Sequence, residues 1–553
     1  MKLAILGIIA LLSIPSAFAA EGTIKLLALT DNGGNETGIL ADLALETRPG
    51  SERVFLETFP LTKIATQVSL RFAQQVACAE LDADCSGTDF FFTIKAAPGI
   101  VGGPSAGAAA AVLAAALVDD RMLDKEVGIT GTINSGGLIG PVGGIQAKLE
   151  AAASGGLKKV LIPQGTALHK EDNTTIDLVA LGDTLGIEVI EVATLDEALE
   201  HFTGTAIVRP EQALVIDPTY AATMKQVATD LCERDREPSE EILNLTAIAD
   251  TSFAQGEYYT AASYCFRANI VSRREELAAK EFDDDEFKEA IAETLVEVLK
   301  FESEIDKKEL ITITDIQTYM LVKERIQETF DSLGTLRKVS PGAVRELAYA
   351  QERLYSARTW NRFFGIGGQE HRLDNESLQR SCHSKLGEAE ERYNYVQSFF
   401  PDSLRDTRKT LDRAQAHAED AEFVLCLYQA AKAKSEADVL LSVTGVEQAR
   451  TQELIDAKLE ATAHSLSRAQ AKGIFPLIGY SYYEYARALR DEDPYSALLF
   501  AEYANEMSNL HIVFGKPKRM VLPQLQESVL IAFLLGAVIG GLIVYARMKK
   551  RRR

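Results

Sequence analysis

The sequence predicts an α/β domain, then an all-α domain and a single C-terminal transmembrane helix, and three observations lead to this prediction. β-rich and helical patterns alternate over residues 23–205, which is typical of layered α/β packing. Long helical patterns with few Pro or Gly residues fill 221–515, after a linker predicted at 206–220. Residues 528–546 carry no charge over 19 positions, which is long enough for a helix to cross a hydrocarbon core of roughly 30 Å.

Composition and charge exclude several classes of protein. The chain has 553 residues, with 58 Lys and Arg against 80 Asp and Glu, a formal net charge of −22 and 46% hydrophobic residues. These values are ordinary for globular proteins and exclude a disordered chain, a collagen and a polytopic membrane protein. An acidic chain also lacks the basic face that nucleic acids require, so no nucleic-acid partner is expected.

The first 19 residues have the pattern of a secretory signal peptide. Lys2 supplies a positive charge, residues 3–14 form an apolar run, Pro15 ends it, and residues 17–19 offer a small-x-small cleavage site. The alternative is an uncleaved signal anchor, and both interpretations export the rest of the chain.

The C-terminal residues predict the orientation of the membrane anchor. A basic tail over 547–553 follows the uncharged segment at once, and basic clusters of this kind stay on the cytoplasmic side. We therefore expect an extracytoplasmic protein body and a short cytoplasmic tail at the cell membrane. Gly536 and Gly540 form a G-x-x-x-G step, which indicates either a dimer contact between two such helices or a lipid-facing surface with small residues.

Export permits disulfides, and the chain has 6 cysteines. Many pairings are compatible with six cysteines. We favour one short bridge and two longer bridges between neighbouring helices, namely Cys78 with Cys85, Cys232 with Cys265, and Cys382 with Cys426.

The elements of the α/β region follow from residue patterns. Strands are predicted where polar and apolar residues alternate or β-branched and aromatic residues cluster, and helices where apolar residues recur at helical spacing. A loop rich in Gly and Pro is expected over 98–104, before an alanine-rich helix. The predicted strands are 23–29, 39–46, 90–96, 127–133, 159–162 and 187–192, and the predicted helices are 64–78, 106–117, 146–153 and 195–202.

One internal similarity is visible in the all-α region. The Tyr-Thr-Ala at 259–261 and the Tyr-Ser-Ala at 495–497 each lead to an alanine at the same spacing, Ala268 and Ala504. This similarity predicts degenerate helix-turn-helix repeats that resemble the tetratricopeptide kind. A plain helical bundle is the alternative.

The segment that carries chemistry is Gly-Gly-Pro-Ser-Ala-Gly at 102–107. Ser105 lies in a tight turn that enters a helix, where unpaired backbone N–H groups can stabilise developing negative charge. We therefore predict Ser105 as an acyl-transfer nucleophile, with the backbone of Pro104, Ser105 and Ala106 around the oxyanion. The alternative is a loop whose serine only caps the helix.

A serine nucleophile needs a base, and no histidine precedes His169 in the chain. A lysine can serve where burial lowers its pKa toward neutrality. Lys148 is the candidate, because it lies on the first turn of a predicted helix between apolar neighbours such as Ile145 and Leu149. The positive end of that helix also disfavours the charged form. The alternative is a solvated surface lysine.

Four motifs in register resemble the proteolytic domain of the Lon protease family. They are GPSAG at 103–107, ITGTI at 129–133, GxxxPVGGIQAKLEAA at 137–152 and GGLKKVLIP at 155–163. The resemblance extends over about 23–205 and implies the Lon fold and a serine endopeptidase. It also implies a catalytic dyad of Ser105 and Lys148, whose separation of 43 residues is the family's spacing. Thr130 falls on the family's threonine, which supports the lysine.

The chain departs from the family pattern at two positions and in one module. Gly102 stands where an acidic residue is usual, and Thr132 where glutamate is frequent. No G-x-x-x-x-G-K-[ST] phosphate loop occurs, so no ATP is expected as a partner. The 7 histidines are scattered and no CxxC or HExxH motif occurs, so neither a metal nor another cofactor is expected.

Together these features predict an ATP-independent, membrane-anchored, extracytoplasmic serine endopeptidase that cleaves exposed or unfolded polypeptide segments. The expected partners are polypeptide substrates, the membrane and further copies of the chain, arranged in a ring or a dimer. The all-α region is expected either to capture substrates or assist assembly, or to act as a spacer above the bilayer.

Two other functions compete with this one. GPSAG also matches the G-x-S-x-G turn of α/β-hydrolases, which would need His169 or His201 to complete a triad. A Lon-like fold with an altered site would instead be a catalytically inactive binding or scaffold protein, for which Gly102 is the main support.

Overall fold

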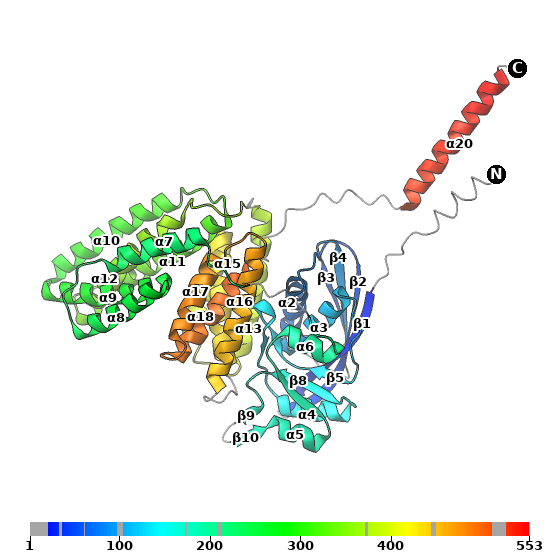
Figure 1. Ribbon diagram of the computed structural model, residues 1–553, viewed down its shortest axis with the longest axis horizontal. Helices are drawn as coiled ribbons and strands as arrows, with labels where there is room; N and C mark the ends of the chain where they lie inside the picture. The colour runs from blue at the N-terminus through cyan, green and yellow to red at the C-terminus, as the bar shows by residue number, and fades with distance from the viewer. Residues whose placement is uncertain are drawn as a thin grey trace. The chain divides into compact units, whose positions relative to one another are not determined.

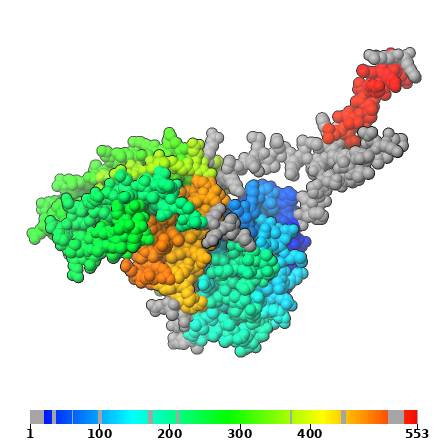
Figure 2. Space-filling view, in the orientation of Figure 1, coloured from blue at the N-terminus to red at the C-terminus, as the bar shows by residue number. Residues whose placement is uncertain are grey.

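The structure is a computed structural model, and the residues that it describes are 20–31, 36–59, 61–96, 103–171, 174–207, 213–370, 374–443, 450–510 and 527–551. The predicted signal peptide, 1–19, and Gly102 lie outside these ranges. The chain divides into two units, Met1–Val513 and Phe514–Arg553 (Figure 1). The first unit holds an α/β region, blue to teal in Figure 2, followed by a region of helices, green to orange, as predicted.

A mixed seven-stranded sheet forms the α/β region, with the strand order β11-β8-β5-β1-β2-β4-β3. β1 pairs antiparallel with β2 along its whole length, whereas β1, β5, β8 and β11 run parallel to one another, as connections through helices require. The strands of this sheet are β1 (Ala20–Asp31), β2 (Glu36–Pro49), β3 (Val54–Phe59), β4 (Thr88–Ala96), β5 (Val127–Ile129), β8 (Lys159–Pro163) and β11 (Glu188–Val192).

Two short hairpins lie outside this sheet, and one of them corrects a prediction. They pair β6 (Thr132–Ile133) with β7 (Ile139–Gly140) and β9 (Leu168–Glu171) with β10 (Thr174–Asp177). The single strand predicted over 127–133 is wrong, because it is interrupted between β5 and β6. At the interruption the Gly131 N–H donates to the Ser105 carbonyl at 3.4 Å instead of to a neighbouring strand.

The sequence patterns do not predict the edge strand β3. It pairs in parallel with β4, and its side chains alternate between half-buried and exposed. The exposed positions hold Phe55 and Phe59 as well as Glu57, so no polar face marks the strand. Phe55 instead stacks on Phe91, with ring centroids 4.6 Å apart.

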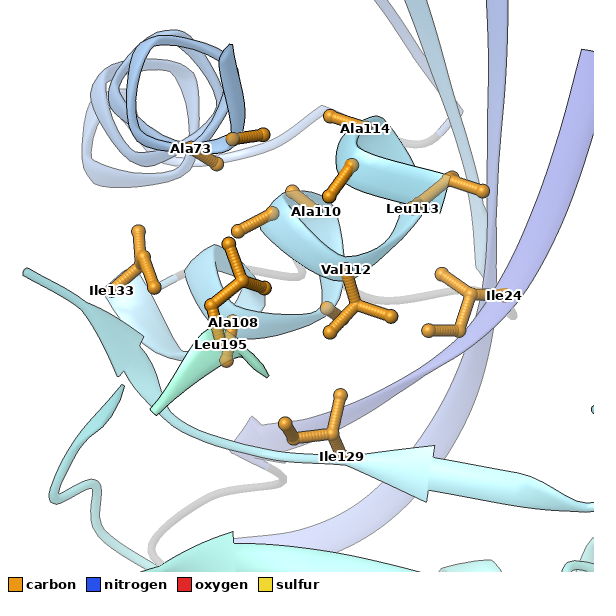
Figure 3. Close-up of a cluster of buried hydrophobic side chains, with 14 of the residues drawn as sticks. Ile24, Ala73, Ala108, Ala110, Val112, Leu113, Ala114, Ile129, Ile133 and Leu195 are labelled. Atoms are coloured by element: carbon orange, nitrogen blue, oxygen red, sulfur yellow. The ribbon is translucent and has the colours of Figure 1, made fainter. Parts of the chain in front are cut away.

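An alanine-rich helix, α3 (Gly107–Val118), lies at the centre of the α/β core. Figure 3 shows its side chains between Ile129 of the sheet and Ala73 of α2. Its small side chains let it approach its neighbours closely. A Cβ atom at Gly107 would lie 3.0 Å from the backbone N of Ile133, so a larger residue would displace this strand. The other α-helices here are α2 (Ile64–Glu80), α4 (Ile145–Ser154), α5 (Leu178–Leu185) and α6 (Leu195–Thr203).

The rest of the first unit is helical. The repeated sequence pattern lies at the starts of α9 and α18. Each of these helices is the second of two consecutive helices, α8 with α9 and α17 with α18. The first pair turns at Gly256, whose φ of 83° suits glycine. The helices are α7 (Pro218–Cys232), α8 (Glu240–Gln255), α9 (Tyr258–Ala279), α10 (Asp284–Ile305), α11 (Ile313–Thr335), α12 (Pro341–Trp360), α13 (Asn375–Gln397), α14 (Arg405–Glu419), α15 (Phe423–Ser442), α16 (Thr451–Ala471), α17 (Leu477–Leu489) and α18 (Pro494–Ser508).

The second unit contains one helix, α20 (Glu527–Arg551), over the part that the structure describes. Its apolar side chains from Leu534 onward are exposed. Within the described residues, no helix combines the length and the apolar character that crossing a membrane requires.

The three predicted disulfides are confirmed: Cys78–Cys85, Cys232–Cys265 and Cys382–Cys426. The first joins the C-terminal part of α2 to the loop that follows this helix, and the other two link α7 to α9 and α13 to α15. Each therefore joins elements that already pack together.

We expect removal of the Cys382–Cys426 bridge to destabilise the protein more than removal of the Cys78–Cys85 bridge. The sequence separations are 44 and 7 residues, and chain-entropy arguments give about 4 and about 2 kcal/mol for loops of these lengths. Urea unfolding of the two double Cys→Ala variants would measure both losses. Equal losses, or a larger one for the short loop, would contradict this ordering.

Candidate active site

The predicted nucleophile lies at the entrance to the central helix. Ser105 is the middle residue of a single 3-10 turn, η1 (Pro104–Ala106), and α3 begins directly after it. Gly103 precedes the turn with φ 132°, a conformation that favours glycine. Ser105 is half-buried. The turn thus presents the serine at the N-terminal end of a buried helix.

The predicted base and its threonine are in contact. Lys148 lies in the first turn of α4 with its side chain only 2% exposed, and Thr130 is fully buried. The Lys148 Nζ donates to the Thr130 Oγ1 at 3.2 Å. Gly144 precedes the helix as its N-cap with φ 64°, a conformation that favours glycine. Lys148 is therefore not the solvated lysine of the alternative interpretation.

Backbone hydrogen bonds join the serine turn to the threonine segment. The Gly131 N–H donates to the Ser105 carbonyl at 3.4 Å, and the Ala108 N–H donates to the Gly131 carbonyl at 3.1 Å. Gly131 adjoins Thr130 in the chain, so these bonds link the turn that carries Ser105 to the segment that Lys148 contacts. This connection depends on the interruption between β5 and β6.

The predicted oxyanion donors need one correction. Proline has no backbone N–H, so Pro104 cannot donate to an oxyanion. It instead fixes the first residue of η1. Ser105 and Ala106 retain N–H groups in the same turn, close to the N-terminus of α3, where donors without intrahelical partners are expected.

The remaining candidate residues are two histidines and Thr132. His201 is in the last turn of α6, and His169 belongs to β9, where its side chain is not described. Thr132 is buried, and its hydroxyl oxygen has no hydrogen-bond partner. Among the described residues, no group of three or more His, Cys, Asp or Glu side chains is placed to hold a metal ion.

The helical region contacts the segment that follows Thr130. The Arg392 guanidinium donates to the Asn134 Oδ1 at 3.0 Å, and the Ser135 hydroxyl donates to the Glu506 Oε2 at 2.7 Å. The Asn505 amide also donates to the Ser135 carbonyl. Sequence reasoning missed these residues, because the partners are more than 250 positions apart and no motif marks them.

A cluster of buried charged side chains adjoins these contacts. Glu506 accepts from Lys385 Nζ at 2.5 Å and from Lys434 Nζ at 2.9 Å. Burial opposes ionisation of Glu506, but these two lysines hold its pKa well below the usual value. Both ammonium groups also lie 5.1 Å from the ring centroid of Phe72 on α2. The cluster therefore holds the helical region against the α/β region.

Glu391 adjoins this cluster, and we expect its contribution to the stability of the folded protein to depend on pH. Burial raises its pKa to about 7, against the opposing charges of Arg392 and Lys434, and its Oε1 has no hydrogen-bond partner. A carboxyl whose pKa is higher in the folded state contributes stability below its unfolded pKa and loses it as pH rises toward 7. We expect Glu391→Gln to stabilise the protein at pH 8 by up to about 3 kcal/mol and to change little near pH 4. Denaturant unfolding at both pH values tests this, and a difference independent of pH would contradict it.

Comparisons with known proteins agree with the motifs. A family model described as the Lon protease (S16) C-terminal proteolytic domain matches residues 87–203. The chain is 33% identical over 156 residues to the Lon protease of Paraburkholderia phytofirmans, covering 27% of this chain and 19% of that one. It is 27% identical over 200 residues to the archaeal Lon protease of Methanothermobacter thermautotrophicus, covering 34% and 28%.

A third relative is the archaeal Lon protease of Archaeoglobus fulgidus, 30% identical over 171 residues, which are 30% of this chain and 26% of the relative. The chain thus spans less than a third of the length of each of these relatives. The similarity covers the segment that contains Ser105, Thr130 and Lys148. Residues 87–203 of this chain are therefore a Lon-type proteolytic domain.

Proposed function

We propose that this chain is an ATP-independent serine endopeptidase with Ser105 as nucleophile and Lys148 as base. The observation that carries the proposal is the contact between the buried Lys148 Nζ and the Thr130 Oγ1, at 3.2 Å, within a Lon-type proteolytic domain. Burial of an ammonium group is unfavourable, so a lysine held in this position favours a role for its uncharged amine. The absence of a phosphate loop from these 553 residues supports independence from ATP.

In the proposed reaction, the Ser105 Oγ attacks a peptide carbonyl carbon while its proton passes to the uncharged Lys148 Nζ. The carbonyl oxygen becomes an oxyanion, which the N–H groups of Ser105 and Ala106 stabilise. The C–N bond then breaks, and Lys148 returns the proton to the leaving amine. Water, deprotonated by Lys148, hydrolyses the acyl-enzyme ester and restores Ser105. Thr130 orients the lysine amine throughout.

The helical region is proposed to complete this site rather than to act only as a spacer. The contacts from Arg392 and Glu506 to residues 134 and 135 support this, because they fix the chain four and five positions after Thr130. Substrates are proposed to be exposed or unfolded polypeptide segments, since no motif of this chain would couple ATP to unfolding.

The protein is further proposed to be exported and anchored in the membrane by residues 528–546. The sequence support is the uncharged segment followed by the basic tail. The exposed apolar side chains of α20, including Leu535, Val538 and Leu542, also favour a lipid environment. Partition of the full chain into detergent, compared with a chain ending at residue 515, tests this part of the proposal.

A peptidase assay tests the proposed activity. Purified protein is incubated without ATP with an unfolded substrate such as casein and with a stably folded protein, and Ser105→Ala serves as the control. Cleavage of the unfolded substrate alone, lost in the variant, is the expected result. Cleavage that persists in Ser105→Ala would refute the nucleophile assignment, and no cleavage by the wild-type protein would favour a binding or scaffold function.

A further inference from the structure

The helical region contains a cavity that the proposed protease mechanism does not use. It measures about 280 Å³, slightly below the range of about 300–1,000 Å³ that is common for small-molecule sites. Its walls come from α7, α9, α11, α12, α15, α17 and α18, and none of its lining residues belongs to the α/β region. The cavity is therefore distinct from the candidate active site.

Aromatic rings form much of the cavity wall. Tyr259 meets Trp360 edge to face with ring centroids 5.8 Å apart, and Tyr485 meets Phe500 in the same way at 4.7 Å. Tyr482 adds a further ring to the lining. Because the rings brace one another, the wall is preorganised to receive a flat apolar group.

Most of the charged groups in the wall are already paired. Lys432 forms an ion pair with Glu324, and Arg353 forms one with Glu328. Burial would raise the pKa of Glu328, but neighbouring cations, Arg353 first among them, hold it below the usual value. Both carboxylates are thus committed to cations of the wall.

Arg325 is the exception. Its side chain is 5% exposed, and its guanidinium donates to the Ser356 hydroxyl at 3.3 Å and to the Leu321 carbonyl at 3.0 Å. It also lies 4.7 Å from the Trp360 ring centroid. Among the ion pairs of the described residues, none joins Arg325 to a carboxylate, unlike Arg353 and Lys432. One buried cation in the wall therefore has no direct ion pair, although its charge contributes to lowering the pKa of the nearby Glu328. Burial of such a cation is unfavourable unless a ligand supplies a carboxylate in direct contact.

We propose that this cavity binds an aromatic carboxylate, with the ring between the aromatic side chains and the carboxylate on Arg325. The planar guanidinium fork matches a carboxylate in geometry as well as in charge. Two sources offer this chemistry, a free small acid and the C-terminal aromatic residue of a peptide. The proposal does not depend on the protease activity, so Ser105→Ala should bind as the wild-type protein does.

The single tryptophan of the chain makes the site directly observable, because Trp360 lies in the cavity wall. Its fluorescence is followed while the full chain is titrated with 3-phenylpropanoate and, separately, with the uncharged 3-phenylpropanamide. We expect a saturable change with the acid and at least about tenfold weaker binding of the amide. The same comparison with Ac-Ala-Ala-Phe and its C-terminal amide distinguishes a peptide terminus from a free acid. Equal binding of acid and amide in both pairs, or no saturation with any of them, would overturn the proposal.

Variants distinguish loss of the contact with the ligand from loss of the folded structure. Arg325→Gln is expected to lose the preference for the acid, as measured by calorimetry to avoid its effect on Trp360. Ser263→Phe keeps every charge but fills the cavity, so it should abolish binding even if Arg325→Gln fails to fold. Arg274→Gln, on the same helix as Ser263 but outside the lining, is the matched control and should bind normally. Unchanged binding in Ser263→Phe would refute the cavity as the site.

Discussion

Replacement of Lys148 by alanine is expected to lower peptidase turnover at least about 10⁴-fold, and replacement of Ser105 should have a similar effect. The two groups act as a unit, because an unactivated serine hydroxyl is a poor nucleophile and a base without a nucleophile has no proton to accept. Alanine at 148 also removes a buried polar group, and the Thr130 hydroxyl loses the hydrogen bond from Lys148. Turnover of casein and of a fluorogenic peptide, measured on folded variants, gives the size of the effect.

Two further variants sharpen this result. Lys158→Ala removes an exposed lysine just after α4 and should leave turnover unchanged. Thr130→Val keeps the shape of the side chain but removes the hydroxyl that orients Lys148, so turnover should fall by an intermediate factor of about 10–100. Labelling of Ser105 by a fluorophosphonate should also fail in Lys148→Ala. Labelling at the wild-type rate would show that another group activates the serine.

The parts of this site that depend on local sequence could be predicted. Glycine and proline around Ser105 specify a tight turn, and the run of alanines after it specifies a helix that can be buried on every side. Apolar neighbours placed Lys148 on a buried helical turn, and its burial followed. The disulfide scheme was one favoured choice among many pairings, and each bridge joins cysteines no more than 44 positions apart.

The parts that depend on distant residues could not be predicted. Gly131 lies in a β-rich run of the sequence, so no residue pattern indicates that the strand is interrupted there. The interruption arises from the hydrogen bond between Gly131 and the Ser105 turn. Asn134 and Ser135 look like ordinary loop residues until Arg392 and Glu506 are placed against them. In a helical sequence pattern, polar residues such as Arg392 and Glu506 are expected to be exposed to solvent. They are buried here because the helical region packs against the α/β region.

The second large effect is expected from Glu506→Gln, which removes one charge from the cluster that joins these regions. Glutamine keeps the size of the side chain but leaves Lys385 and Lys434 buried without the shared carboxylate. Removal of one partner of a buried ion pair typically destabilises a protein by about 3–5 kcal/mol. We expect a loss of this size at pH 7 in denaturant unfolding, whereas Glu453→Gln, which alters an exposed glutamate, should change stability by less than about 1 kcal/mol.

The pH dependence provides an independent check on the same residue. Because the lysines hold the pKa of Glu506 below its ordinary value of 4.5, its ionised form contributes stability above that pH, and the contribution is lost as pH falls below it. The difference between wild type and Glu506→Gln should therefore be largest near neutrality and shrink under acid conditions. The double variant Glu506→Gln/Lys434→Met should recover part of the loss, since it removes one of the two buried cations that lose Glu506 as a partner. A single variant as stable as the wild type at pH 7 would show that the cluster does not hold the regions together, and the catalytic segment after Thr130 would then need another support.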